Sequence, residues 1–516
     1  MWPLSASEIY QAILKNQKCE KEFNTIMIKG VCIDSRKVNS DHLFVAIKGS
    51  QHDGHAYLKD CFQKGVQLAL VDENSNYLNE LTAEQKKKCI CVSDVLASFR
   101  QFAKFMRSQF SFPVLGIGGS NGKTTTKEMI ASILSGGNYK VTKTEKSENG
   151  FLGMAITLCQ EDHNKNKSPD CLVLEIGIDD IGAMTQHVDL GQPNISILTA
   201  LGPEHLEHLI NWETAANEEL ILFKNPKTRR IWQLADEKIL KFFLEQVKLN
   251  EQNTKSDISL KNDFIVVEKK YFAKIGIDKS TILKNVSTLI LWDIFEITPT
   301  GSEVSLEINS NISTIKNEKD IHFKVPLPGI HNASNFALAF ASAIMLNRSL
   351  NEIALGWSKF VSPPMRSRIS YLKDQNILFD DCYNSSPMSL EAALHAVQNE
   401  EWKEKNKLLI LGDMLDLGNE SKYWHENVFH ALKNIKNAYL CLYGLAMYDC
   451  YKLLKETEDL LLSENKTRIF WRAAQDDPSQ FLTDIHVNLS GFVILVKGSR
   501  GMKLDRVIKS IESVYC

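Results

Sequence analysis

The chain has 516 residues, with 44% hydrophobic and 24% charged side chains, which excludes a disordered or fibrous protein. Its net charge is -3, so the overall field does not favour nucleic acid. The longest apolar run, residues 336–346, is too short to span a bilayer, and the N-terminus lacks the basic start of a secretory signal. The 11 cysteines contain no C-x-x-C pair, which indicates reduced thiols, so we expect a cytoplasmic protein of about three domains.

The first expected domain covers residues 1–92 and has α/β character. Short apolar runs at 31–33, 43–47 and 68–71 alternate with turns and predict strands.

The amphipathic segment 94–110, which follows this domain, predicts a helix, because its apolar side chains recur at helical spacing. Ser93 is the expected N-cap of this helix.

The second expected domain covers residues 93–362 and contains a parallel sheet. Buried-type strands are predicted at 114–117, 171–176 and 195–200, with a helix over 123–135. Residues 255–325 alternate polar and apolar side chains, so we expect an antiparallel addition to the same domain. A further helix is expected to begin near Ala333.

The third expected domain covers residues 363–516 and has a Rossmann-like fold. Paired prolines at 363 and 364 stop the preceding helix and predict a linker. Strands at 377–380, 407–411 and 492–496 alternate with helices, which is typical of a small doubly wound domain. The sequence therefore predicts an α/β protein of three domains.

A glycine-rich turn at 118–122 joins the strand at 114–117 to the next helix. Glycines allow positive φ, so successive backbone N–H groups can converge on phosphate oxygens at the helix N-terminus. Lys123 would neutralise the β- and γ-phosphates, and the Thr124 hydroxyl would bind Mg²⁺. The strict pattern has glycine at 117, where this chain has isoleucine. The turn predicts binding of a nucleoside triphosphate and leaves the reaction open.

The extended loop sequence at 116–129, GIGGSNGKTTTKEM, resembles that of the Mur ligases, which are ATP-dependent amino-acid and peptide ligases of peptidoglycan synthesis. The likeness continues in order along nearly the whole chain. It covers a UDP-sugar domain at 34–36, 41–49 and 53–55, and a central ATP-binding domain at 144–153, 174–177, 202–207 and 329–335.

Three segments of the last domain indicate which members of the family this chain resembles most. Residues 380–387, residues 411–418 with His425, and residues 496–501 are similar to the members that add D-alanyl-D-alanine to UDP-N-acetylmuramoyl-tripeptide. The resemblance implies an acyl-phosphate mechanism that yields the pentapeptide, with ATP and Mg²⁺ as cofactors. The two substrates are small molecules, and we expect a monomer with no nucleic-acid partner.

The resemblance also implies which residues carry the chemistry. Lys123, Glu175 and His205 are the implied catalytic residues. Glu175 lies near the carboxyl end of a predicted strand, where α/β sheets place ligands. The alternatives to these roles are a solvated loop acid or a helix cap for Glu175 and a structural histidine for His205. The expected magnesium ligands are Thr124, Glu175 and His205, and Glu219 is a fourth candidate.

Glu219 is a departure from the family pattern. In several Mur ligases a lysine fourteen residues after the equivalent of His205 is carbamylated and binds the second Mg²⁺; here that position is Glu219. We hypothesise that Glu219 supplies the anionic ligand directly, so that activity needs no CO₂. The alternative is a solvated acid on a helix face.

Further contacts follow from the resemblance. The implied ATP-binding residues are Gly118, Gly119, Ser120, Asn121, Gly122, Lys123, Thr124, Thr125, Asn332, Asn335, Arg368 and Asp381. The implied substrate-binding residues are Ser35, Arg36, Asn149, Lys497, Ser499 and Arg500. Ser147 and Gly150 replace family asparagines beside Asn149, and Ser367 replaces the usual glycine before Arg368. The simpler alternatives are helix caps for Asn332 and Asn335, an N-cap for Ser35, and surface charge for the basic residues.

Other functions remain open from the sequence. Another Mur-type or a folylpolyglutamate-type ligase would share the chemistry with a different amine. A nucleotide-binding module without ligase activity is disfavoured, because it needs no second-metal ligands. A nucleic-acid-dependent ATPase lacks a stripe of basic and aromatic residues.

Overall fold

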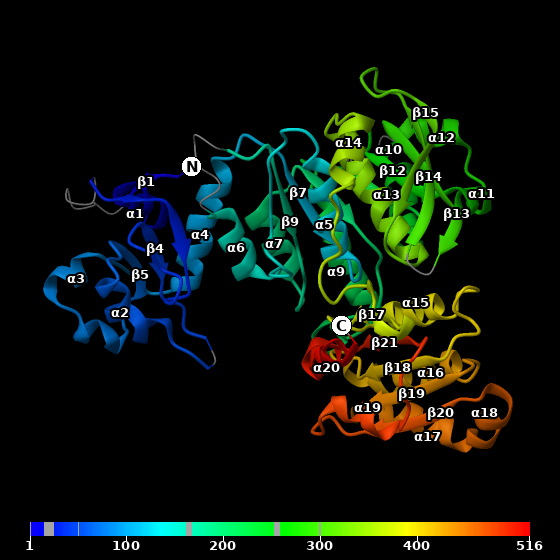
Figure 1. The fold of residues 1–516 in the computed structure, drawn as a ribbon. Helices are drawn as coiled ribbons and strands as arrows, with labels where there is room; N and C mark the ends of the chain where they lie inside the picture. Colours follow the sequence, from blue (N-terminus) through cyan, green and yellow to red (C-terminus); the bar gives the residue numbers. More distant parts are fainter. Residues whose placement is uncertain are drawn as a thin grey trace. The chain divides into compact units, whose positions relative to one another are not determined.

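The computed structural model describes residues 2–14, 25–49, 51–160, 168–251, 259–298 and 301–515 (Figure 1). They fall into two compact units: Met1–Gly116, Asn138–Gly177 and Met184–Ile195 form the first, and Ile117–Gly137, Ile178–Ala183 and Ser196–Cys516 form the second. The expected domain boundaries at 92 and 362 stay predictions. No helix within the described ranges has the length and apolar character needed to cross a membrane.

The first unit begins with the α/β fold expected from its apolar runs. Its four-stranded sheet has the order β3-β4-β5-β6, and all neighbours are parallel. The predicted strands are confirmed to within two residues. The elements of this unit are β1 (Leu4–Ser5), α1 (Ala6–Leu14), β2 (Met27–Ile28), β3 (Gly30–Cys32), β4 (His42–Val45), α2 (Leu58–Gln63), β5 (Leu68–Asp72), α3 (Ala83–Lys87), β6 (Cys89–Val92), α4 (Val95–Ser108), β8 (Val141–Lys143), α6 (Phe151–Leu158) and β9 (Cys171–Glu175).

Helix α4 corrects one prediction. Its N-cap is Asp94, whose carboxylate accepts the Ala97 N–H at 2.9 Å, and not Ser93. The carboxylate satisfies an end amide and also suits the positive end of the helix dipole. Two candidate caps stand side by side here, and the charged one is used.

The chain passes from the first unit to the second within β7 (Val114–Gly118), and α7 (Ala183–Gly191) and β10 (Ile195–Leu198) also cross the division. In the second unit, six neighbouring strands have the order β15-β14-β13-β12-β11-β10. Its elements up to the linker are α5 (Lys123–Leu134), α8 (Leu206–Leu209), α9 (Trp212–Lys224), β11 (Arg229–Gln233), α10 (Glu237–Glu251), β12 (Phe264–Glu268), α11 (Lys269–Ile275), α12 (Lys279–Asn285), β13 (Thr288–Thr298), β14 (Gly301–Ser310), β15 (Glu318–Val325), α13 (Ile330–Met345) and α14 (Leu350–Trp357).

The expected antiparallel addition is confirmed for β13, β14 and β15. In contrast, β12 pairs in parallel with both β11 and β13, so the addition begins one strand later than expected. Residues 255–258 and 299–300 of that stretch lie outside the described residues. Helix α13 starts at Ile330, three residues before the predicted start, because Gly329 takes φ +92° and ends the preceding extended segment.

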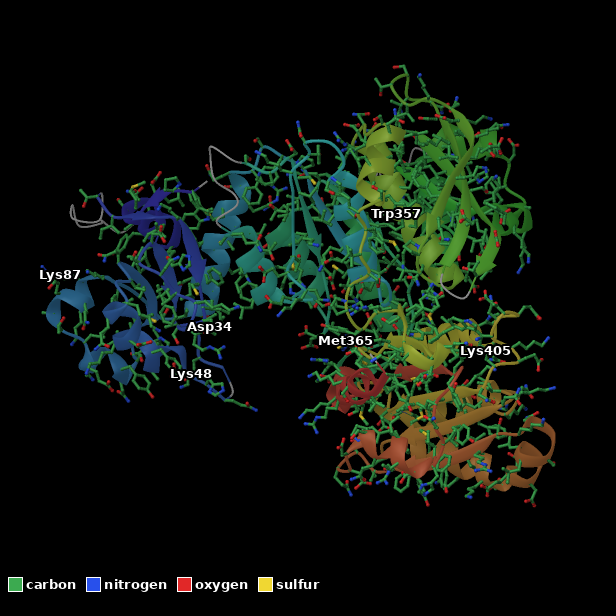
Figure 2. All side chains as sticks on the ribbon, viewed as in Figure 1. Asp34, Lys48, Lys87, Trp357, Met365 and Lys405 are labelled. Carbon is green, nitrogen blue, oxygen red and sulfur yellow. The ribbon has the colours of Figure 1, made fainter. Side chains whose placement is uncertain are left out.

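The linker after α14 covers residues 358–367, all of which the structure describes, and these residues form neither a helix nor a strand. Trp357, labelled in Figure 2, is the last residue of α14. Its indole N–H donates to the Lys324 carbonyl at 2.8 Å. Met365, also labelled in Figure 2, has φ +60°, and Ser367 has φ +49°. Positive φ at position 367 is a conformation that glycine adopts more easily than serine.

The last part of the chain is a doubly wound sheet, as predicted. Its order is β16-β17-β21-β18-β19-β20, with only β16 antiparallel to its neighbour. Alternate strand residues pack against α15–α18 on one face and against α19 and α20 on the other. Figure 1 draws this part of the chain in yellow to red. The elements are β16 (Arg368–Tyr371), β17 (Ile377–Asp381), α15 (Pro387–Val397), β18 (Lys407–Gly412), α16 (Ser421–Leu432), β19 (Ala438–Tyr443), α17 (Met447–Glu456), α18 (Glu458–Asn465), β20 (Arg468–Arg472), α19 (Phe481–Asp484), β21 (Val493–Lys497) and α20 (Asp505–Tyr515).

Candidate active site

The phosphate loop has the strand–turn–helix geometry that its sequence predicts. Gly119 and Gly122 take φ +113° and +89°, and Gly122 caps α5, which begins at Lys123. A Cβ on Gly119 would overlap the Thr199 hydroxyl. Ile117, at the position of the missing glycine, is fully buried inside β7, which ends at Gly118, so the turn begins at Gly119.

Lys123 is buried at the start of α5. Its Nζ donates to the Gly119 carbonyl and to the Ser120 carbonyl at 3.3 Å, and it forms an ion pair with Glu204 Oε1 at 3.2 Å. Burial raises the pKa of Glu204 to about 8; the Lys123 charge opposes this shift and the Glu219 charge reinforces it. Sequence reasoning missed Glu204, although it directly precedes His205.

Glu219 lies on α9 and points at the same loop. Its Oε2 accepts the Gly119 N–H at 2.7 Å, and the side chain is 1% exposed, so it is not a solvated helix-face acid. Its Oε1 is buried and finds no hydrogen-bond partner among the described residues. Burial raises the pKa of Glu219, whereas Lys123 and the Gly119 N–H oppose the rise.

His205 lies between β10 and α8, in a left-handed conformation with φ +52°. Its Nδ1 is 4.0 Å from Asp416 Oδ2. Burial lowers the pKa of His205, and the Lys123 charge acts in the same direction. A lowered pKa keeps the imidazole neutral, which is the form that can bind a metal ion.

Glu175 and Asn149 come together within the first unit. Glu175 ends β9 and is 1% exposed, and its backbone N–H donates to Thr144 Oγ1 at 3.0 Å. Asn149 Nδ2 donates to Glu175 Oε1 at 3.0 Å. The one family asparagine that this segment retains therefore orients the predicted carboxylate.

Asn332 and Asn335 lie inside α13 and do not cap it, because the N-cap is Gly329. Asn332 Nδ2 donates to the Pro328 carbonyl at 2.7 Å and to His331 Nε2 at 3.0 Å. The Asn335 amide packs against Gly122, where a Cβ would come within 2.7 Å of Oδ1. Burial lowers the pKa of His331 to about 4, Asp381 opposes the shift, and Lys497 reinforces it.

Two of the residues predicted to bind substrate, Lys497 and Ser499, bond to other parts of the protein. Lys497 is buried and pairs with Asp381 Oδ2 at 2.5 Å, and Asp381 Oδ1 accepts the Ser367 N–H at 2.8 Å. Ser499 Oγ accepts the Leu415 N–H at 2.9 Å. The side chains of Lys497, Asp381 and Ser499 therefore all bond to other protein groups.

Arginines 500, 368 and 36 are the exposed members of the predicted set. The Arg500 side chain is 55% exposed, and its Nη1 is 3.6 Å from Asp505 Oδ1. Arg368 is exposed in the edge strand β16. Arg36 holds both carboxylate oxygens of Asp34, and this hydrogen bonding lowers the pKa of Asp34 to about 2. Ser35 offers its carbonyl to Lys64 Nζ at 2.9 Å.

One contact that the sequence did not indicate joins the last sheet to the phosphate loop. Ser386, the N-cap of α15, donates from Oγ to Asn121 Oδ1 at 2.8 Å. Met388 packs on Gly202, where a Cβ would overlap its sulfur. Residues 265 positions apart thus meet at the loop.

Family models match three consecutive parts of the chain. "Mur ligase family, catalytic domain" matches residues 27–105, "Mur ligase middle domain" matches 117–343, and "Mur ligase, glutamate ligase domain" matches 367–500. The chain belongs to the Mur ligase family.

Relatives in this family match over almost their full length. The UDP-N-acetylmuramoyl-tripeptide–D-alanyl-D-alanine ligase of Bacillus subtilis (strain 168) is 26% identical over 97% of this chain and 96% of that protein. The Escherichia coli (strain K12) protein of the same name is 23% identical over 94% of each. A crystal structure of MurF from Acinetobacter baumannii covers 99% of each chain with a TM-score of 0.72 and 22% identity, which shows a shared Mur ligase fold.

Proposed function

We propose that this Mur ligase joins D-alanyl-D-alanine to UDP-N-acetylmuramoyl-tripeptide with hydrolysis of ATP to ADP and phosphate, supplying a precursor for peptidoglycan and so for cell shape and division. The observation that carries the proposal is the phosphate loop with its buried Lys123, set in a chain that aligns over 97% of its length with a relative of that name. A Mur ligase structure from Thermotoga maritima, TM-score 0.66, was solved with ADP.

The reaction has two balanced steps. The terminal carboxylate of the tripeptide attacks the γ-phosphorus of ATP, the bond to the β-phosphate oxygen breaks, and ADP leaves. The amine of D-alanyl-D-alanine then attacks the acyl carbon, loses a proton, and displaces phosphate. Two anions approach each other in the first step, so positive charge is required there. Lys123 is held for this role at the N-terminus of α5, whose dipole favours phosphate.

We propose Thr124, His205 and Glu219 as the magnesium ligands of the second unit, and Glu175 as a magnesium ligand of the first. The buried Glu219 Oε1, which has no partner among the described residues, fits a cation. No three His, Cys, Asp or Glu side chains gather into a metal site within the part of the chain that is described, so substrate oxygens and water would complete the coordination. Bound Mg²⁺ would supply charge screening at the phosphates.

The native carboxylate of Glu219 predicts that activity does not depend on bicarbonate. The test compares rates with and without added bicarbonate in CO₂-depleted buffer, together with Glu219→Gln. Glutamine keeps an oxygen for the Gly119 N–H and removes the charge. Glu218→Gln, at the neighbouring buried residue on α9, is the matched control. A bicarbonate requirement, or full activity of Glu219→Gln, would overturn the assignment.

The remaining site assignments are proposals of the same kind. Asn332, Asn335, Arg368 and Asp381 are proposed to contact ATP. Ser35, Arg36 and Asn149 are proposed to contact the UDP-tripeptide, and Lys497, Ser499 and Arg500 to orient the acceptor. Of these last three, Arg500 has an exposed side chain, whereas Lys497 pairs with Asp381.

We also propose three domains with boundaries near residues 92 and 362, a monomeric state, and a cytoplasmic location. All cysteines that the structure describes are free thiols, which supports a reducing compartment. Limited proteolysis tests the boundaries, and light scattering after gel filtration tests the monomer.

The experiment for the proposed reaction measures ADP release with each substrate alone and with both together. D-alanyl-D-alanine is compared with D-alanine, L-lysine, diaminopimelate and L-glutamate as the amine. ADP release that needs the tripeptide and D-alanyl-D-alanine supports the proposal. Release driven by another amine indicates a different Mur-type or folylpolyglutamate-type ligase, and release independent of both substrates indicates a simple nucleotidase.

A further inference from the structure

The groups that a phosphate loop offers to a nucleotide are bonded here to the protein itself. The Gly119 N–H donates to Glu219 Oε2 at 2.7 Å. The Ser120 and Asn121 N–H groups both donate to the Ala200 carbonyl, at 2.9 and 3.2 Å. The Lys123 ammonium pairs with Glu204 Oε1 at 3.2 Å. A bound triphosphate would require these same donors, because loop amides and the lysine are what hold its β- and γ-phosphates.

Glu204 is well placed to hold Lys123. Its side chain is 11% exposed and that of Lys123 is 10% exposed, so water screens the pair little. The neighbouring Ser120 side chain lowers the pKa of this carboxylate and so opposes the effect of burial. Ser120 Oγ in turn accepts the Gly202 N–H at 2.9 Å, so the segment 202–204 is fixed against the loop by its backbone.

A carboxylate and a phosphate oxygen are both anionic acceptors for an ammonium group, and a lysine ammonium has only three donors. Two of the Lys123 donors already reach the carbonyls of Gly119 and Ser120. The carboxylate of Glu204 therefore bonds to the ammonium group that a phosphate would also need. Its negative charge would also repel the phosphates at short range.

We propose that Glu204 is an internal competitor for the phosphate-binding lysine, which weakens nucleotide binding and speeds the release of ADP after each reaction. The proposal rests on the proposed function only in that the loop binds ATP and ADP. When ADP departs, Glu204 pairs with Lys123 again. Glu219 satisfies the Gly119 amide in the same way, but it is also a proposed magnesium ligand, so Glu204 isolates the effect of competition.

The test is the affinity for ADP in EDTA, measured by titration calorimetry above the pKa of Glu204. Without divalent cations, a role of Glu204 as a metal ligand cannot contribute. Glu204→Gln keeps the shape and the hydrogen bond but removes the charge. We expect it to bind ADP about tenfold more tightly, as the loss of one charge-assisted hydrogen bond in competition implies. In stopped-flow experiments the ADP dissociation rate should fall correspondingly.

Glu213→Gln is the matched control, because Glu213 also pairs with a lysine, Lys238, but on the surface. It should leave the ADP affinity unchanged. An unchanged or weaker ADP affinity of Glu204→Gln would overturn the proposal. If Glu204→Gln does not fold, Glu204→Asp retracts the carboxylate by one methylene, and its ADP affinity should be higher than that of the natural protein; an equal or lower affinity would again refute competition.

The assay also separates this proposal from the proposed function. ADP binding needs neither the tripeptide nor the amine. A protein that binds ADP more tightly after Glu204→Gln but never forms product would refute the ligase function alone. An active ligase whose ADP affinity is the same with and without Glu204→Gln would refute the competition alone.

Discussion

The turn at Gly119 offers a sharp test of the phosphate-loop geometry. Gly119 has φ +113°, and a Cβ there would overlap Thr199 Oγ1 and lie 3.0 Å from the Thr199 backbone nitrogen. Thr199 is fully buried and its hydroxyl donates to the Gly118 carbonyl at 3.1 Å, so it cannot move without losing that bond. Gly182 is the matched control, because it has φ +86° with no atom within 4 Å of a built Cβ.

The expected magnitudes follow from these two environments. Alanine at positive φ costs about 1–2 kcal/mol, which is the whole expected effect of Gly182→Ala. Gly119→Ala adds overpacking of about 1–3 kcal/mol and a lost hydrogen bond of about 1 kcal/mol. Equilibrium urea unfolding of both variants measures the free energy of unfolding, and ADP titration reports the loop. Equal destabilisation by the two substitutions would show that the loop backbone is not held against Thr199 as described.

Three further predictions concern contacts around the site and the core. Ser386→Ala should raise the Kd for ADP and lower stability by about 1 kcal/mol, because it removes a helix cap and the bond to Asn121; calorimetric titration that finds the natural affinity would contradict this. Asp263→Ala should cost about 3–5 kcal/mol in thermal unfolding, because it leaves the fully buried Arg230 without its 3.2 Å partner; a cost below that of an average surface substitution would refute it. His331 is buried in its neutral form, with a pKa of about 4 against an ordinary 6.5. Its contribution to the free energy of unfolding is present above pH 6.5 and is lost as the pH falls toward 4, and it amounts to at most about 3 kcal/mol. His331→Gln should therefore reduce the loss of stability on the acid side when the free energy of unfolding is measured against pH. An unchanged pH dependence would disprove this.

Local patterns predicted the elements that position the site. The apolar run at 68–71 became β5, and the glycine turn before Lys123 became the capped start of α5, because both depend on neighbouring residues only. The N-cap of α4 was misplaced by one residue, since Ser93 and Asp94 are both good caps and only the folded backbone decides between them.

Contacts between distant residues were beyond sequence reasoning. The pairing of Lys123 with Glu204 spans 81 positions, and that of Lys497 with Asp381 spans 116. Lys497 was predicted to meet a substrate, and nothing local reveals that a half-buried aspartate, Asp381, already neutralises it. The parallel pairing of β12 was missed for the same reason, because alternation along a strand does not indicate the direction of its neighbours.

The central claim is that Lys123 enables transfer of the γ-phosphate to the terminal carboxylate of the tripeptide. The most direct measurement incubates the protein with ATP, Mg²⁺, UDP-N-acetylmuramoyl-tripeptide and D-alanyl-D-alanine, and follows the product by mass spectrometry. The account predicts the UDP-linked pentapeptide from the natural protein and a rate at least about a hundredfold lower from Lys123→Ala. Pentapeptide formed at the natural rate by Lys123→Ala, or no pentapeptide from the natural protein, would contradict it.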